Sequence, residues 1–119
     1  MVLVAVGDAL VRLGRASDDD PKPMLELLST ANKDLIEGGL RAIAMLRMKL
    51  NEPSVRTIIE YVSRPENERL RFWVAAAAAG WSGPWVDTFL RLCSNASLED
   101  TRTAAAAAVN KQYLPWNPL

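Results

Sequence analysis

Few residues of this chain have the type and spacing that enzyme chemistry requires. The 119 residues include no histidine, which removes the commonest general base and the commonest protein ligand of metal ions. Cys93 is the single cysteine, and it follows Phe89 and Leu90 at the spacing of one apolar helix face. A cysteine in that position is expected to fill a hydrophobic core as a small apolar side chain, and not to act as a nucleophile.

Acidic residues are the other candidates for chemistry. The run Asp18–Asp20 precedes a predicted helix over residues 22–31, where negative charge complements the helix N-terminus. A metal site would need further ligands that converge in space, and Glu60 and Asp87 fall on surface positions of other predicted helices. We therefore predict no catalytic, metal-binding or cofactor-binding residues, no cofactor, and no enzymatic activity.

The composition is that of a globular domain without net charge. Lysine and arginine number 14 and aspartate and glutamate also number 14, so the net charge gives no reason to expect a nucleic acid or an anionic membrane as partner. Half of the residues are apolar, but no apolar run approaches the length of about 18 residues that would cross a membrane. A single cysteine excludes an intramolecular disulfide and suits a reducing compartment, so the cytoplasm is the expected location.

A repeat of about 31 residues organises the chain. Four prolines recur at nearly even intervals: Pro21, Pro53, Pro84 and Pro115. The intervals are 32, 31 and 31 residues, and a fixed period of about 20–50 residues is typical of solenoids and other stacked repeats.

The second helix of each repeat is the clearest element. Residues 53–63 align without a gap on residues 84–94, and the matched apolar pairs are Val55 with Val86, Ile58 with Phe89, Ile59 with Leu90, and Val62 with Cys93. Their i, i+3, i+4, i+7 spacing predicts one buried helix face in each segment. Proline is favoured at the first helical position, so the helices are expected to begin near Pro53 and Pro84.

The first helix of each repeat carries an arginine and then a run of alanines. Glu68 and Arg71 match Glu99 and Arg102 at an offset of 31 residues, and Arg41 stands at the corresponding place one repeat earlier. Alanine is the best helix former and the smallest side chain that keeps a helix, so these runs indicate closely packed helices. We expect buried side chains at Leu40, Ile43, Leu46, Ile58, Ile59, Val62, Val74, Phe89, Leu90 and Cys93.

These patterns predict a single all-helical domain without a β-sheet. The expected helices cover residues 2–15, 22–31, 33–50, 53–64, 67–80, 84–95 and 98–112, and they group into units over residues 1–32, 33–65, 66–96 and 97–119. Pro115-Trp116 repeats Pro84-Trp85 in register, so the last unit is incomplete, which favours self-association or a longer array.

The acidic-to-arginine step, the alanine run behind it and the helix that opens at Pro53 or Pro84 resemble HEAT-like repeats. The similarity is to the short bacterial type found in phycobilin-lyase-like proteins, and it covers residues 33–113. It implies a right-handed α-α superhelix of about three and a half helix pairs. It also implies that Arg41, Arg71 and Arg102 tie adjacent repeats together.

Solenoids bind partners on the curved surface that their second helices form. The unburied positions of these helices predict a partner-binding set of Arg56, Glu60, Tyr61, Trp85, Asp87, Thr88, Arg91 and Leu92. Leu27, Tyr61 and Leu92 form an aligned apolar row that either seals the contact between repeats or serves as an apolar stripe for a partner. The tryptophans Trp81, Trp85 and Trp116 either cover helix ends or act as binding hot spots.

The resulting hypothesis is a non-catalytic protein–protein interaction module or scaffold, with another protein as its partner. One alternative, which the resemblance implies, is an enzyme subunit of the lyase-like type. The other is a HEAT-like nucleic-acid-binding domain, in which Arg56, Arg64 and Arg91 would form a basic stripe although Glu60 and Asp87 lie among them.

Overall fold

Five α-helices follow one another in the described part of the chain, which is residue 26, residues 28–30 and residues 32–114 of a computed structural model. The helices are α3 (Lys33–Met45), α4 (Glu52–Val62), α5 (Arg71–Ala77), α6 (Pro84–Ser94) and α7 (Glu99–Val109), and short 3₁₀ turns, Pro65–Leu70 and Ala78–Gly80, flank α5. No strand occurs in these ranges, as the periodicity predicted. The helices expected over residues 2–15 and 22–31 lie wholly or mostly outside the described residues, as does the run Asp18–Asp20.

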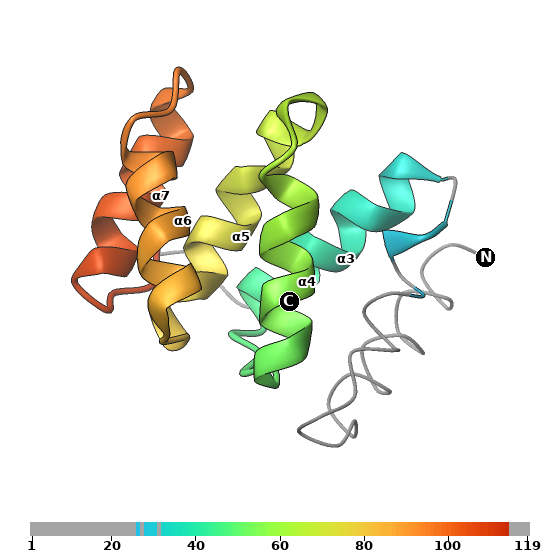
Figure 1. Ribbon diagram of the computed structural model, residues 1–119, viewed down its shortest axis with the longest axis horizontal. Coiled ribbons are helices and arrows are strands. Elements are labelled where there is room, and N and C mark those ends of the chain that lie inside the picture. Colours follow the sequence, from blue (N-terminus) through green and yellow to red (C-terminus); the bar gives the residue numbers. More distant parts are fainter. Residues whose placement is uncertain (1–25, 27, 31, 115–119) are drawn as a thin grey trace.

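The helices alternate between two layers (Figure 1). α5 packs between α3 and α7, so these three helices lie side by side. α4 and α6 contact each other and α5, and they lie on the same side of it (Figure 1). The exposed surfaces of α4 and α6 therefore belong to one side of the molecule.

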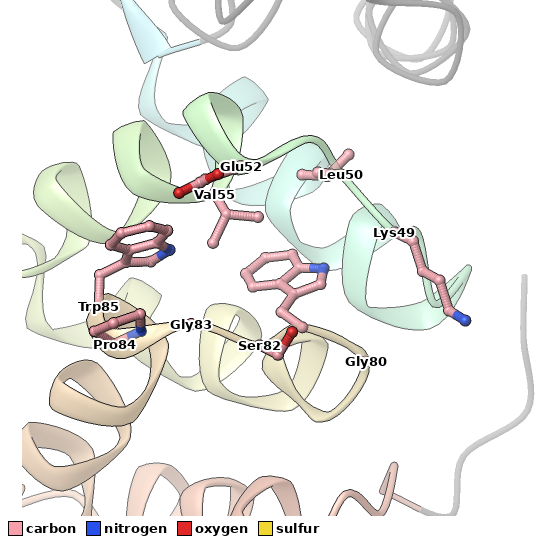
Figure 2. Close-up of a pocket in the computed structure, with 10 residues that line it drawn as sticks. Lys49, Leu50, Glu52, Val55, Gly80, Ser82, Gly83, Pro84 and Trp85 are labelled. Carbon is pink, nitrogen blue, oxygen red and sulfur yellow. The ribbon is translucent and has the colours of Figure 1, made fainter. Parts of the chain in front are cut away.

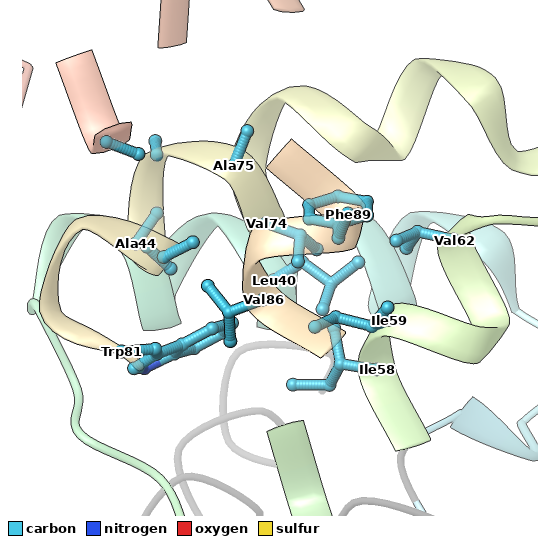
Figure 3. Close-up of a cluster of buried hydrophobic side chains, with 14 of the residues drawn as sticks. Leu40, Ala44, Ile58, Ile59, Val62, Val74, Ala75, Trp81, Val86 and Phe89 are labelled. Atoms are coloured by element: carbon cyan, nitrogen blue, oxygen red, sulfur yellow. The ribbon is translucent and has the colours of Figure 1, made fainter. Parts of the chain in front are cut away.

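One hydrophobic core lies between the layers. The apolar faces predicted for the two aligned helices are buried: Val55, Ile58, Ile59 and Val62 on α4, and Val86, Phe89, Leu90 and Cys93 on α6. Figure 3 shows Phe89 and Val86 of α6 beside Ile58 of α4 and Val74 of α5. The alanines over residues 75–79 are buried too, which lets α5 approach both of its neighbours closely.

Helix α3 is shorter than predicted, because it ends at Met45 and not near residue 50. Arg47 adopts a left-handed backbone with φ of 53°. The backbone N–H groups of Arg47 and Met48 donate to the carbonyls of Ala44 and Ile43, at 3.1 and 3.0 Å, which is the Schellman pattern of a helix end. Leu46 therefore leaves the apolar face, and it is 46% exposed where we predicted burial.

Two of the three matching arginines join a helix to the chain that precedes it. Arg71 is buried, and its guanidinium donates to the carbonyls of Val62 and Ser63 at the end of α4, at 2.7 and 3.0 Å. Arg102 donates in the same way to the carbonyls of Ala96 and Ser97, at 2.7 and 3.1 Å. Both arginines therefore have a structural role, because each holds its helix to the segment that precedes it.

The third arginine of this set behaves differently. Arg41 is exposed, and its guanidinium carbon lies 5.5 Å from the centroid of a Trp73 ring. Trp73 belongs to α5, so the contact joins α3 to α5 through a cation–π interaction instead of carbonyl hydrogen bonds.

Candidate functional site

The eight residues predicted to bind a partner lie on the adjacent helices α4 and α6. We call them the α4/α6 face: Arg56, Glu60 and Tyr61 on α4, and Trp85, Asp87, Thr88, Arg91 and Leu92 on α6. Six of them are exposed, whereas Tyr61 and Trp85 are half-buried and pack against the core. Six of the eight side chains therefore lie on the solvent side of two helices that touch, whereas Tyr61 and Trp85 also contribute to packing.

A contact between Arg56 and Trp85 links the two halves of the α4/α6 face. The guanidinium carbon of Arg56 lies 5.0 Å from the centroid of a Trp85 ring, within the range of a cation–π interaction. Trp85 stands in the first turn of α6, so the contact spans the space between the helices. Side chains of α4 and α6 are therefore in contact on this side of the molecule.

Charged residues form a regular row that runs along α4 and ends at Arg64, just beyond the C-cap Ser63. Between residues 52 and 64 the exposed side chains are Glu52, Arg56, Glu60 and Arg64, four residues apart and alternating in sign. Arg64 turns toward Tyr61, with 5.5 Å from its guanidinium carbon to the ring centroid. Both arginines thus face aromatic rings, and within residues 32–114 neither Glu52 nor Glu60 forms an ion pair.

Only part of this row was predicted from the sequence. Arg56 and Glu60 belong to the predicted partner-binding set and Arg64 to the basic stripe of the nucleic-acid alternative, whereas Glu52 was not predicted. The i, i+4 spacing of Glu52, Arg56 and Glu60 indicates that these three charges share one side of a helix.

A half-open pocket of about 440 Å³ lies beside the α4/α6 face, between the segment that precedes α4 and the loop that precedes α6 (Figure 2). Its lining consists of Lys49, Leu50, Glu52, Val55, Gly80, Trp81, Ser82, Gly83, Pro84 and Trp85. The lining combines two indole rings with one carboxylate and one ammonium group, and it contains no nucleophile paired with a base.

Trp81 in this pocket is structural. It is only 5% exposed, and its indole Nε1–H donates to the Met48 carbonyl at 3.0 Å. The Lys111 ammonium donates to the Trp81 carbonyl at 2.9 Å, so three loops are joined around this residue. Of the tryptophans left open by the sequence, Trp81 covers helix ends, Trp85 lies on the α4/α6 face, and Trp116 lies outside the described residues.

Gly83 allows Trp85 to lie against its own loop. Its φ of 134° is in the region that favours glycine, and a Cβ atom there would lie 3.1 Å from the nearest atom of the Trp85 ring. The indole Nε1–H of Trp85 is buried and has no hydrogen-bond partner among the described residues. The position of the Trp85 ring is thus fixed by packing.

Cys93 lies in the core, as predicted, with 0% of its surface exposed. Burial raises the pKa of the Cys93 thiol from 9.0 to about 12, although the nearby Arg71 opposes this shift. At neutral pH the side chain is therefore a protonated thiol without access to solvent, which does not suit a nucleophile.

The apolar row expected beside the buried face is resolved in part. Leu27 lies outside the described residues, Tyr61 packs against the core, and Leu92 is 41% exposed. Of the two described members, Tyr61 therefore contributes to packing, whereas Leu92 offers apolar surface to solvent.

Among the described residues no three or more histidine, cysteine, aspartate or glutamate side chains gather as a metal site would require. Nor does that part of the chain hold a helix with the length and apolar character needed to span a bilayer. Comparison of the chain with known protein families, curated proteins and solved structures gave no match.

Proposed function

We propose that this chain is a non-catalytic protein-interaction module and that the α4/α6 face contacts the partner protein. The observation that supports the proposal best is the contact of Arg56 with Trp85, which joins exposed charged and apolar side chains of two helices into one surface. Aromatic and arginine side chains are the usual anchors of protein interfaces.

The anchors on this surface are held in place before a partner arrives. Trp85 and Tyr61 are half-buried against the core, and each has an arginine over its ring. Side chains that are already ordered lose less conformational entropy on binding, which favours affinity. Leu92, at 41% exposure, adds apolar area at the far end of the face.

We further propose that the helices build a short right-handed α-α superhelix of the HEAT-like type, with α3/α4 and α5/α6 as successive pairs and α7 as the first helix of the next. The alternation of the helices between two layers supports this architecture. So do Arg71 and Arg102, which occupy matching positions and bind carbonyls of the preceding loop.

The charge pattern favours a protein over a nucleic acid as the partner. Glu60 stands one helical turn from Arg56 on α4, and Asp87 stands one turn from Arg91 on α6. A nucleic acid presents a uniformly negative backbone, which a surface of alternating charge does not complement.

The experiment is a comparison of immobilised baits in lysate of the source cell, followed by affinity measurement with the purified partner. Arg91→Ala and Tyr61→Ala are expected to weaken the complex by about 5- to 30-fold, the range for interface anchors. Thr103→Ala on the exposed side of α7 is the matched control and should bind as the wild type does. Melting temperatures of all baits separate lost contacts from lost folding.

Unchanged affinity in both variants, with a partner in hand, would move the binding site away from the α4/α6 face. The turn tryptophans Trp81 and Trp116 would then be the next positions to replace.

A further inference from the structure

We propose that the α4/α6 face binds a second copy of this chain, with the two α4 helices antiparallel across a two-fold axis. This inference rests on the proposed function, because it names the partner of the same face. It is carried by the row of alternating charge that Glu52, Arg56 and Glu60 of α4 form with Arg64 just after the helix, because this row is complementary to itself.

The self-complementarity follows from the order of the charges. In a two-fold interface, residue i of one molecule faces residue j of the other, and j faces i. Glu52, Arg56, Glu60 and Arg64 read negative, positive, negative, positive, and the reversed row reads with every sign exchanged. Glu52 then faces Arg64 of the second copy and Arg56 faces its Glu60, so all four pairs of the row are attractive.

Among the described residues, no ion pair competes with these four pairs. Neither carboxylate of the row has an ion pair within residues 32–114. A guanidinium that stacks on a ring keeps its N–H donors in the plane of the group, where a carboxylate can accept them. Arg56 over Trp85 and Arg64 over Tyr61 can therefore bind carboxylates of a second copy without giving up their aromatic contacts.

The surface around the row has room for side chains of a second molecule. A hollow of about 390 Å³ is lined by Glu52, Pro53, Arg56, Thr57 and Glu60. A second hollow of about 230 Å³ is lined by residues of the row together with Tyr61 and Leu28.

Rows of residues four apart form ridges on a helix, and two such ridges run parallel when the helices cross at about 50°. The row of each copy can then lie along the other.

Charge reversal tests the pairing directly. We expect sedimentation velocity of the wild type to show a concentration-dependent species of twice the 13.1 kDa mass of one chain. Glu60→Arg places two arginines opposite each other, and Arg56→Glu places two glutamates opposite each other. Each single variant is expected to weaken the dimer at least tenfold, because like charges that face each other at an interface are strongly unfavourable.

The double variant Arg56→Glu/Glu60→Arg restores opposite charges at both positions and should dimerise again. Its dissociation constant is expected within about fivefold of the wild-type value, the difference coming from the lost contact between Arg56 and Trp85. Asp100→Arg changes the net charge as Glu60→Arg does, but it lies in the first turn of α7, so it should leave the dimer unchanged.

Several results would overturn the proposal. These are a monomeric wild type up to about 1 mM, dimers that persist in both single variants, or a folded double variant that stays monomeric. If the single variants fail to fold, the salt dependence of the wild-type dimer still tests the proposal. The dimer should weaken several-fold between about 50 and 500 mM NaCl, because salt screens the charges. A salt-insensitive dimer would also contradict the proposal.

Failure of the dimer proposal can be distinguished from failure of the proposed protein-interaction function. A monomeric wild type that still binds another protein through Tyr61 and Arg91 would reject only the second copy as the partner. A salt-insensitive dimer that survives all charge reversals, together with no effect of Tyr61→Ala or Arg91→Ala on any complex, would reject the α4/α6 face itself.

Discussion

Ser54 and Thr101 place hydroxyl groups in the interior of the protein. Both residues are 0% exposed, and neither hydroxyl has a hydrogen-bond partner among the described residues. An unsatisfied buried polar group costs about 1–3 kcal/mol, so each hydroxyl lowers the stability of the fold. At these two positions an apolar side chain of similar size would give a more stable core.

Thr101→Val removes one of these hydroxyls with little change of shape. We expect the free energy of unfolding to rise by about 1 kcal/mol, because a methyl group needs no hydrogen bond. Urea denaturation followed by circular dichroism measures it, and Thr103→Val at an exposed position of the same helix is the control. A less stable Thr101→Val protein would show that the hydroxyl has a partner after all.

Cys93 should make the stability depend on pH in the alkaline range. Its pKa in the folded protein is raised to about 12 from 9.0, so above pH 9.0 the unfolded chain releases this proton first. The full stability is present below pH 9.0 and falls by about 1.4 kcal/mol per pH unit between pH 9.0 and about 12.

Cys93→Val tests this effect, since Val62 of α4 is the residue that aligns with Cys93 in the sequence. Lysine and tyrosine side chains also titrate in this range, so the quantity to measure is the difference between the two proteins. The variant should lose stability less steeply than the wild type above pH 9.0. Equal slopes would mean that the thiol ionises in the folded protein.

The helix ends of α4 and α6 were predicted well from the sequence, whereas the end of α3 was not. The observed starts and ends of α4 and α6 lie within two residues of the predicted ones, because Pro53 and Pro84 mark the starts and the apolar spacing continues to the ends. The end of α3 was missed, since Arg47 in the left-handed region replaces the glycine that usually signals a cap.

The candidate site shows the same division. Exposure on one side of α4 and α6 could be predicted from periodicity, because the buried face determines the exposed one. The stacking of Arg56 on Trp85 could not, since it depends on the distance between two helices and on rotamers that the spacing does not specify. The spacing alone would suggest that Arg56 pairs with Glu52 or Glu60 on the same helix. Because Arg56 turns to Trp85 instead, the lack of ion pairs at these two carboxylates could not be predicted either.

Asn51 contributes to stability at the start of α4. Its side-chain oxygen accepts a hydrogen bond from the backbone N–H of Ser54 at 2.8 Å, which satisfies one of the free donors of the first turn. Asn51→Ala should lower the free energy of unfolding by about 1 kcal/mol, as measured in urea. Asn51→Asp, which keeps the acceptor, should restore most of it, and failure to do so would argue against the cap.

For the whole molecule, α5 is the central element, because it packs against α3 and α7 within one layer and against α4 and α6 in the other. Its buried alanines therefore affect how closely these four helices approach α5. Ala75 is 0% exposed, whereas Ala106 in the alanine run of α7 is exposed, so similar sequences carry different structural demands.

Replacing each of these two alanines by leucine should change the stability of the protein by different amounts. Ala75→Leu adds volume inside the core, and we expect it to lower the free energy of unfolding by about 1–3 kcal/mol. Ala106→Leu adds the same volume on the solvent side of α7 and should change stability by less than about 0.5 kcal/mol. Urea denaturation of the pair measures the difference. Equal effects would mean that α5 does not hold the helices at close distance, and the two-layer packing on which the α4/α6 face depends would need another explanation.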